Sequence, residues 1–233
     1  MIDLASDEAA ILIGLAVALV GCVLRPLWPG ARLVVTAVHE LGHALAALAL
    51  GGRVSRVHLW MNTAGLTTYS LPVRTGRVRS GAVAVAGYPA PGLAGLGGIA
   101  LVVAGQVRWW VAGAAIVTLL LLLLWVRNGW GILSTLAGAG VLGWVALDGA
   151  PWLVTVVGAA LAGVLLTGGW RAAVTHAAGR EAGGRQGSDA VIASRLLPAP
   201  AVAWSGLFLV AATVTLLAGG WLLVDWAADG IQL

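Results

Sequence analysis

Two histidines and a glutamate stand together in the otherwise apolar run VVTAVHELGHALAALALGG, residues 34–52. On a helix, His39 and His43 lie one turn apart on the same face, and Glu40 lies beside them. This HExxH spacing offers two nitrogen ligands to Zn²⁺ and a carboxylate that takes a proton from the metal-bound water. The pattern therefore predicts one zinc ion per chain and peptide hydrolysis, with Glu40 as the general base.

The apolar surroundings of the motif argue against a chance match. The alternative is a helix whose two histidines are merely hydrogen-bonded. Each ionisable group in the middle of a membrane costs roughly 2.5–3.5 kcal/mol on insertion scales. Three such groups within one apolar run therefore favour a metal site.

The elements that must position this motif are membrane helices. Of the 233 residues, 60% are hydrophobic and 9% are charged, whereas about a quarter are charged in a soluble domain. Several runs exceed the ~18 apolar residues that indicate a membrane span. We predict one domain over residues 1–233, an all-α polytopic membrane protein with six to seven transmembrane helices. Breaks at Pro, Gly and Arg give candidate spans at 8–25, 32–50, 80–104, 108–126, 130–147, 151–169 and 201–224.

Two connections are long enough to carry structure of their own. Residues 53–79 contain VHLW and LTTYSL, which are rich in β-branched and aromatic residues, with a turn at 62–65 between them. This pattern predicts a β-hairpin at the membrane face. Residues 170–187 contain four glycines in their second half and are expected to form a flexible polar loop.

Arginines gather in these same two connections, which suits loops that face anionic lipid head groups. With seven spans, both loops and the N-terminus lie on one side of the membrane and the C-terminus lies on the other. The positive-inside rule makes the side with residues 53–79 and 170–195 cytoplasmic. Because no basic patch is interleaved with aromatic residues, nothing indicates binding of nucleic acid.

HELGHALAALALGGRVSRVHLW, together with AGYPAPGLAGL at 86–96, resembles the site-2 protease family of intramembrane zinc metallopeptidases over roughly residues 30–100. In that family the HExxH span is followed by a membrane-associated β-hairpin and by an Ala-Gly-Pro segment in the next span. SDAVIASRLLP at 188–198 resembles a compact bacterial branch without an attached PDZ or nucleotide-sensing domain. The resemblance implies a bacterial plasma-membrane enzyme whose partners are the lipid bilayer and transmembrane protein substrates, with no nucleotide.

The third metal ligand is where the chain departs from the family pattern. Most members supply an aspartate from an Asn-Pro-rich segment that ends in Leu-Asp-Gly. Asp148 lies in such a Leu-Asp-Gly, but the preceding Asn and Pro are missing. The rival is Asp189 in GSDAVIAS, where Ser188 can cap a short helix and set the carboxylate in its first turn. The predicted topology puts Asp189 on the side of the hairpin, so we favour Asp189, with Asp148 as the alternative.

Three further residues are candidates for holding the substrate. Proteases commonly bind a substrate as an added strand, and the hairpin segment 63–69, with Thr63 and Gly65, is the candidate edge. Its alternative role is to plug the helix bundle. Asn128 could hydrogen-bond a tetrahedral oxyanion, although the end of a span also commonly contacts lipid head groups.

Other conspicuous residues have structural interpretations. His58 and His176 have no partner at ligand spacing and are expected at the surface. Tyr88, with Pro89 and Pro91, is expected to break the third candidate span near the site, so that irregular backbone lines a water-filled cavity.

Two other functions fit the same composition. One is a catalytically inactive membrane scaffold of the same fold. The other is a metal or proton transporter, which would string ionisable residues along several spans, whereas here they concentrate in one motif. The sequence therefore predicts a zinc-dependent intramembrane endopeptidase, with these two functions as alternatives.

Overall fold

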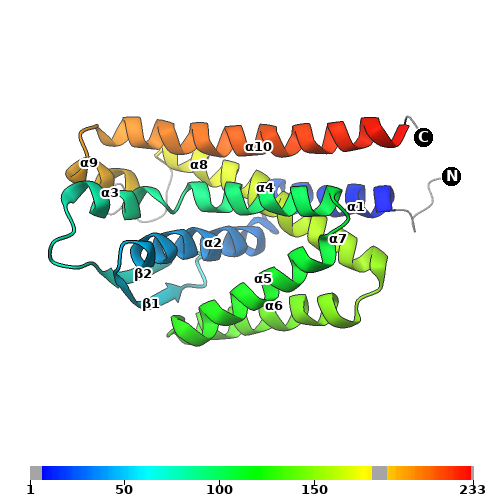
Figure 1. Ribbon diagram of the computed structural model, residues 1–233, viewed down its shortest axis with the longest axis horizontal. Helices are drawn as coiled ribbons and strands as arrows, with labels where there is room; N and C mark the ends of the chain where they lie inside the picture. The colour runs from blue at the N-terminus through cyan, green and yellow to red at the C-terminus, as the bar shows by residue number, and fades with distance from the viewer. Residues whose placement is uncertain (1–6, 180–187, 232–233) are drawn as a thin grey trace.

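Most of the chain is helical, because a backbone in lipid must satisfy its own hydrogen bonds. The computed structural model describes residues 7–179 and 188–231, and Figure 1 shows helices gathered along one long axis with a small hairpin at one end. In chain order the elements are α1 (Asp7–Val23), α2 (Trp28–Ala49), β1 (Arg53–Leu59), β2 (Gly65–Ser70), α3 (Arg77–Val85), α4 (Pro89–Val103), α5 (Val107–Leu124), α6 (Gly129–Asp148), α7 (Pro151–Gly163), the π-helix η1 (Val164–Gly168), α8 (Gly169–Ala177), α9 (Asp189–Leu196) and α10 (Ala201–Ile231).

Within the described residues, four helical stretches are individually long and apolar enough to cross a membrane: α5, α6, the run from α7 through α8, and α10. Two bent pairs also qualify when each is taken together. These are α1 with α2, bent by 99°, and α3 with α4, bent by 55°. Counting each pair as one span gives six. The predicted all-α fold is confirmed, at the lower end of the predicted number of spans.

The first pair covers two of the predicted spans, with a sharp bend between them. In Figure 1, α1 lies toward the end opposite to the hairpin, and α2 leads to the hairpin. The predicted spans 8–25 and 32–50 correspond to α1 and α2, which are long and apolar enough for a membrane span when they are taken together. The helix breaks at residues 24–27, where Pro26 lacks the N–H that a continuous helix requires.

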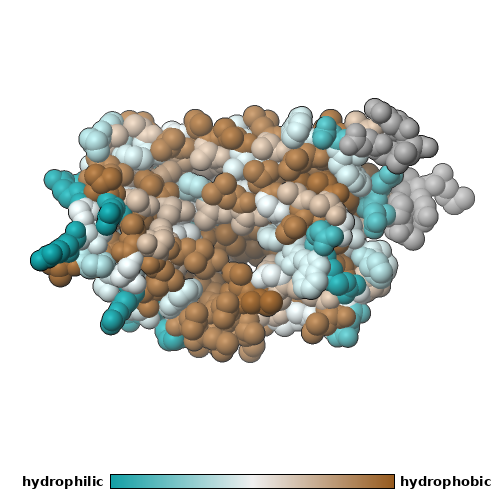
Figure 2. Space-filling model, viewed as in Figure 1, coloured by the Kyte–Doolittle hydropathy of each residue, from teal (hydrophilic) through white to brown (hydrophobic). Residues whose placement is uncertain are grey.

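The surface is typical of a protein that lies in lipid. In Figure 2, apolar residues cover the middle of the visible face and hydrophilic residues gather at the two ends of the long axis. Large aliphatic side chains of α5, α6 and α10 stand exposed, for example Leu123, Leu133 and Leu217. Exposed apolar surface of this extent marks a contact with lipid or protein. The protein is an integral membrane protein.

The predicted hairpin is confirmed. Strands β1 and β2 pair antiparallel, with Leu59 opposite Gly65. Thr63 in the turn adopts a φ of 65°, in the left-handed region. The outer edge of β1 is occupied, because Val57 forms a parallel bridge with Val126. Among the described residues, β2 pairs with a strand on one edge only.

The predicted polar loop at 170–187 is wrong in its first part. Residues 170–177 belong to α8, which continues the apolar run of α7 through η1. Three residues of this stretch, Ala172, Ala173 and Val174, are small or apolar, so nothing local ends the helix before the glycine at 179. Residues 180–187 of the predicted loop lie outside the described residues.

Candidate active site

Helix α2 carries the HExxH motif on a face that points into the molecule. His43 and Glu40 are 7% and 5% exposed, respectively. The Nε2 atoms of His39 and His43 lie 3.1 Å apart. The sequence prediction that helical spacing brings the two imidazoles together is met in this structure.

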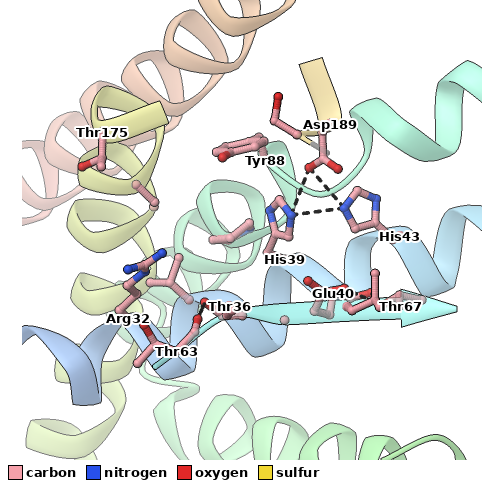
Figure 3. A pocket seen from close by; sticks show the side chains of 18 of the residues that line it. Arg32, Thr36, His39, Glu40, His43, Thr63, Thr67, Tyr88, Thr175 and Asp189 are labelled. Atoms are coloured by element: carbon pink, nitrogen blue, oxygen red, sulfur yellow. Dashed lines mark hydrogen bonds and ion pairs between the residues drawn. The ribbon is translucent and has the colours of Figure 1, made fainter. Parts of the chain in front are cut away.

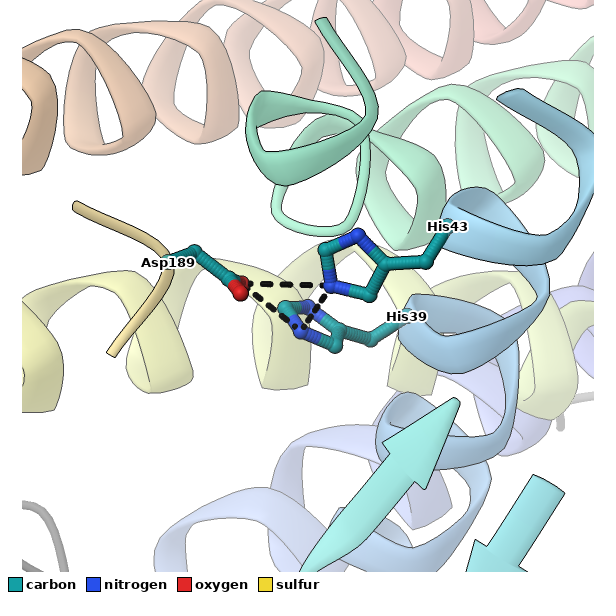
Figure 4. A group of neighbouring side chains, drawn as sticks. All are labelled: His39, His43 and Asp189. Carbon is teal, nitrogen blue, oxygen red and sulfur yellow. Dashed lines mark hydrogen bonds and ion pairs between the residues drawn. The ribbon is translucent and has the colours of Figure 1, made fainter. Parts of the chain in front are cut away.

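Helix α9 brings Asp189 to the two histidines (Figure 4). Oδ2 of Asp189 lies 3.1 Å from Nε2 of His39 and 3.3 Å from Nε2 of His43. Burial alone would raise the pKa of Asp189, but hydrogen bonds and charge interactions with the histidines outweigh burial and hold the pKa well below its usual range. The carboxyl group is therefore ionised, which is the form that binds metals.

The three ligand atoms fit one face of a zinc tetrahedron. Ligands about 2.0–2.1 Å from a tetrahedral zinc are separated from one another by roughly 3.3 Å. The separations among His39, His43 and Asp189 are 3.1, 3.1 and 3.3 Å. In the described part of the chain, this is the one such group of three histidine, cysteine or acidic side chains. Its chemistry suits a catalytic zinc, which keeps its fourth position for water.

Contacts with α3 hold α9 and its aspartate in place. The Arg77 guanidinium donates a hydrogen bond of 2.6 Å to the carbonyl of Arg195. Gly81 leaves room for the Leu197 side chain, which a methyl group at Gly81 would meet. Asp189 is the first residue of α9, as predicted, although no side-chain hydrogen bond caps this helix.

The bend between α3 and α4 supports the histidines. Nδ1 of His43 lies 2.8 Å from the carbonyl of Val83, so Nδ1 donates to this carbonyl and Nε2 is the atom that the neutral ring would offer to a metal. Gly87, at the bend, approaches so closely that a methyl group there would collide with both imidazoles. The break predicted from Tyr88 and the prolines is confirmed, and it brings backbone against the site.

The hairpin holds Glu40 from the other side (Figure 3). The Thr67 hydroxyl donates to Oε2 of Glu40 at 2.7 Å. A Cβ on Gly65 would lie 2.5 Å from Oε1 of Glu40, so only glycine permits this approach. Sequence reasoning missed Thr67, because its contact with Glu40 depends on how β2 packs against α2.

A cavity of about 400 Å³ joins these groups, a size within the usual range for ligand sites. His39, Glu40 and His43 line it from α2, and Asp189 lines it from α9. The predicted substrate residues Thr63 and Gly65 also line it. The hairpin edge and the candidate metal group, which consists of His39, His43 and Asp189, therefore face the same cavity.

Asn128 and Asp148 are not brought to this cavity. Nδ2 of Asn128 donates to the carbonyl of Leu59 at 2.6 Å, and the Leu59 N–H donates to Oδ1 at 3.1 Å. The amide thus clamps the end of β1 and is not aimed at an oxyanion. Asp148 is exposed at the end of α6, remote from α9, and takes no part in the group of three.

The expected surface position of His176 is also wrong. His176 is buried on α8, and its Nε2 lies 3.0 Å from the Ser205 hydroxyl. The Tyr88 ring lies between His176 and His39, with centroid distances of 4.7 and 4.8 Å. Sequence spacing could not show this, because the contact requires α8 to pack against α10. His58 stays on β1 and is partly exposed.

The fold and the site together define a class of protein: a membrane-embedded peptidase with an HExxH helix, a hairpin beside it and an aspartate from a later helix. The chain belongs to the Peptidase M50B-like family, whose model matches residues 12–219. This confirms the resemblance to site-2 proteases and supports a hydrolase that cleaves peptide bonds. Comparisons with curated proteins and with solved structures gave no match.

Proposed function

We propose that the protein is a zinc-dependent intramembrane endopeptidase that cleaves peptide bonds in or near transmembrane segments of other proteins. The observation that carries this proposal is the triangle of Nε2, Nε2 and Oδ2 atoms with edges of 3.1–3.3 Å, beside a buried Glu40. Two neutral imidazoles and one carboxylate suit one zinc ion per chain.

Each residue of the site would have a separate role in peptide hydrolysis. His39, His43 and Asp189 would hold zinc, which when bound polarises the scissile carbonyl and lowers the pKa of its water. Glu40 would take the proton from that water and give it to the leaving amine. Thr67 fixes one oxygen of Glu40 and leaves the other free for this transfer.

The substrate would enter as a strand along β2. The outer edge of β1 is occupied by Val126, whereas Thr63, Gly65 and Thr67 line the cavity. Backbone hydrogen bonds to an edge strand hold a peptide in an extended form. Since Gly65 has no side chain, the added strand can pass close to Glu40.

The cellular setting follows from the surface and the arginines. The proposed partners are the lipid bilayer and transmembrane protein substrates, because a protein with this apolar surface lies among other membrane proteins. The arginine-rich regions 53–79 and 170–195, the second of which begins in the last turns of the run from α7 through α8, would lie at the cytoplasmic side of a bacterial membrane by the positive-inside rule.

The test compares wild type with Glu40→Gln, both purified in detergent. We expect equal bound zinc, measured by elemental analysis, and a fall in the cleavage of single-span substrate proteins by about 100-fold or more. Glu8→Gln, which changes an exposed carboxylate at the start of α1, is the matched control and should cleave normally. Equal cleavage by wild type and Glu40→Gln would reject the proposal.

The same preparations separate the alternatives. Zinc bound by a wild type that cleaves none of the substrates would favour the inactive scaffold. Flux of zinc or protons across proteoliposomes, lost in His39→Ala, would favour a transporter.

A further inference from the structure

A guanidinium lines the same cavity, two helical turns before the metal ligands. Arg32 lies on α2, on the face that carries His39 and His43. In Figure 3 it lies at one end of the cavity, on the side of Thr63 and Thr175, and the metal group lies at the other. A cation and the metal group therefore share one space.

Within the described residues, no hydrogen bond or ion pair engages the Arg32 side chain. The two carboxylates that line the cavity are engaged elsewhere, Glu40 by Thr67 and Asp189 by the two histidines. An arginine in a membrane helix is costly unless it finds a partner, and Arg32 is partly buried. Among the described residues, no anion is thus placed to pair with its guanidinium, which is available to an anion that enters the cavity.

The spacing relates Arg32 to the scissile bond. Seven residues separate it from His39, which is about 10 Å along a helix that rises 1.5 Å per residue. An extended peptide covers about 3.3 Å per residue, so the interval corresponds to about three residues of substrate. The hairpin follows the same stretch, because the Thr36 hydroxyl donates to the carbonyl of Thr63 at 2.9 Å. A strand added along the hairpin would therefore pass Arg32.

We propose that Arg32 is a specificity residue that binds a substrate carboxylate about three residues from the scissile bond. The carboxylate is either an Asp or Glu side chain or the C-terminus of the substrate, since the planar guanidinium binds both in the same bidentate way. This inference rests on the proposed function, because it places a peptide in the cavity.

The test measures binding in the Glu40→Gln background, where the peptide is not consumed. The probes are fluorescent apolar ten-residue peptides, amidated at the C-terminus, in which a single Glu or Gln is moved through the sequence. A Gln peptide with a free C-terminus tests the second source of the carboxylate. At the position of the Glu that gives the tightest binding, we expect the peptide with the carboxylate to bind roughly 10- to 100-fold more tightly than the amidated Gln peptide.

The second substitution Arg32→Gln, made in the Glu40→Gln background, should abolish this preference for the carboxylate. Arg32→Glu should favour a peptide with Lys at the same position, which a merely structural arginine would not do. Arg25→Gln is the matched control, because Arg25 is exposed and does not line the cavity, and it should keep the preference.

Several outcomes would overturn the assignment of Arg32. They are equal affinities for the Glu and Gln peptides, no binding of either, or a preference that survives Arg32→Gln. Arg32-dependent binding of phosphatidylglycerol micelles without a peptide preference would also overturn it in favour of a lipid phosphate. Failure of the proposed function is distinct, because it would show as absent cleavage by wild type while the Arg32-dependent affinity remained.

Discussion

At the scale of single residues, the geometry of the metal group depends on Gly87, a position without a side chain. A methyl group there would collide with Nε2 of His43 and Cε1 of His39. Both are ring atoms of the imidazoles that would hold zinc, and neither ring can retreat without leaving its ligand position. Gly87 is therefore as much a part of the site as the histidines.

We expect Gly87→Ala to lower the affinity for zinc by about tenfold or more, which is the usual effect of disturbing groups around a metal ligand. Competition with a fluorescent zinc chelator measures this affinity. Gly97→Ala on α4 is the matched control, because a Cβ there meets nothing within 4 Å. Unchanged zinc affinity in Gly87→Ala would show that the histidines are not held against this backbone.

The sequence predicts the residues of the site unevenly, for a physical reason. His39, Glu40 and His43 belong to one helix, so their spacing alone fixes their relative positions. Asp189 comes from an element far along the chain, and only weaker arguments, from the topology and from the resemblance of the SDA segment to the compact branch, favoured it over Asp148. The function of Asn128 could not be predicted, because an amide at the end of a span gives no sign of which backbone groups will lie opposite.

At the scale of elements, the hairpin is held where the substrate strand would bind. Thr67 ties β2 to α2 through Glu40, and Asn128 ties β1 to the start of α6 through Leu59. The two contacts fix opposite strands of one small sheet. A two-stranded sheet is marginal in isolation, so these anchors keep the edge of β2 in position.

Asn128→Ala should release the end of β1. Two lost hydrogen bonds correspond to about 1–3 kcal/mol, so the Leu59 amide should exchange with solvent faster, as measured by hydrogen–deuterium exchange. Ser134→Ala is the control, because that hydroxyl bonds only to Gly131 in its own helix. Reduced cleavage with unchanged Leu59 exchange would instead support the catalytic role expected from the sequence.

The elements themselves were largely predictable, whereas their directions were not. Apolar length and the positions of Pro and Gly gave the helices and the hairpin. The 99° bend between α1 and α2 was missed, because an apolar run of sufficient length indicates a span without showing whether its neighbour turns back. Helix α8 was also missed, because the glycines in the second half of 170–187 indicated a loop for the whole segment, whereas its first residues continue the helical run of α7.

At the scale of the whole molecule, the metal group connects parts of the chain that are distant in sequence. α2 comes from the first quarter of the chain, and α9 lies between α8 and α10 in the last quarter. A bound ion would cross-link these two helices across the cavity. Its binding energy would then add to the stability of the folded state.

Removal of zinc with a chelator should therefore lower the thermal midpoint in detergent by about 5 °C or more, measured by tryptophan fluorescence. Asp189→Asn should have the lower midpoint already and should not respond to the chelator. Asp148→Asn should behave like wild type. A chelator response that is lost in Asp148→Asn and kept in Asp189→Asn would reverse the assignment of the third ligand.

The single open edge of the hairpin has a consequence for the choice of substrates. With the outer side of β1 bridged by Val126, the edge of β2 is the one that the described residues leave for an incoming strand. The N-to-C direction of that strand must then allow hydrogen bonds with the backbone of β2 and also place the scissile bond beside Glu40. A membrane protein cannot turn over within the bilayer, so the orientation it acquires at insertion decides whether its backbone runs the right way. The orientation of a substrate in the membrane would thus select it before any of its side chains is recognised.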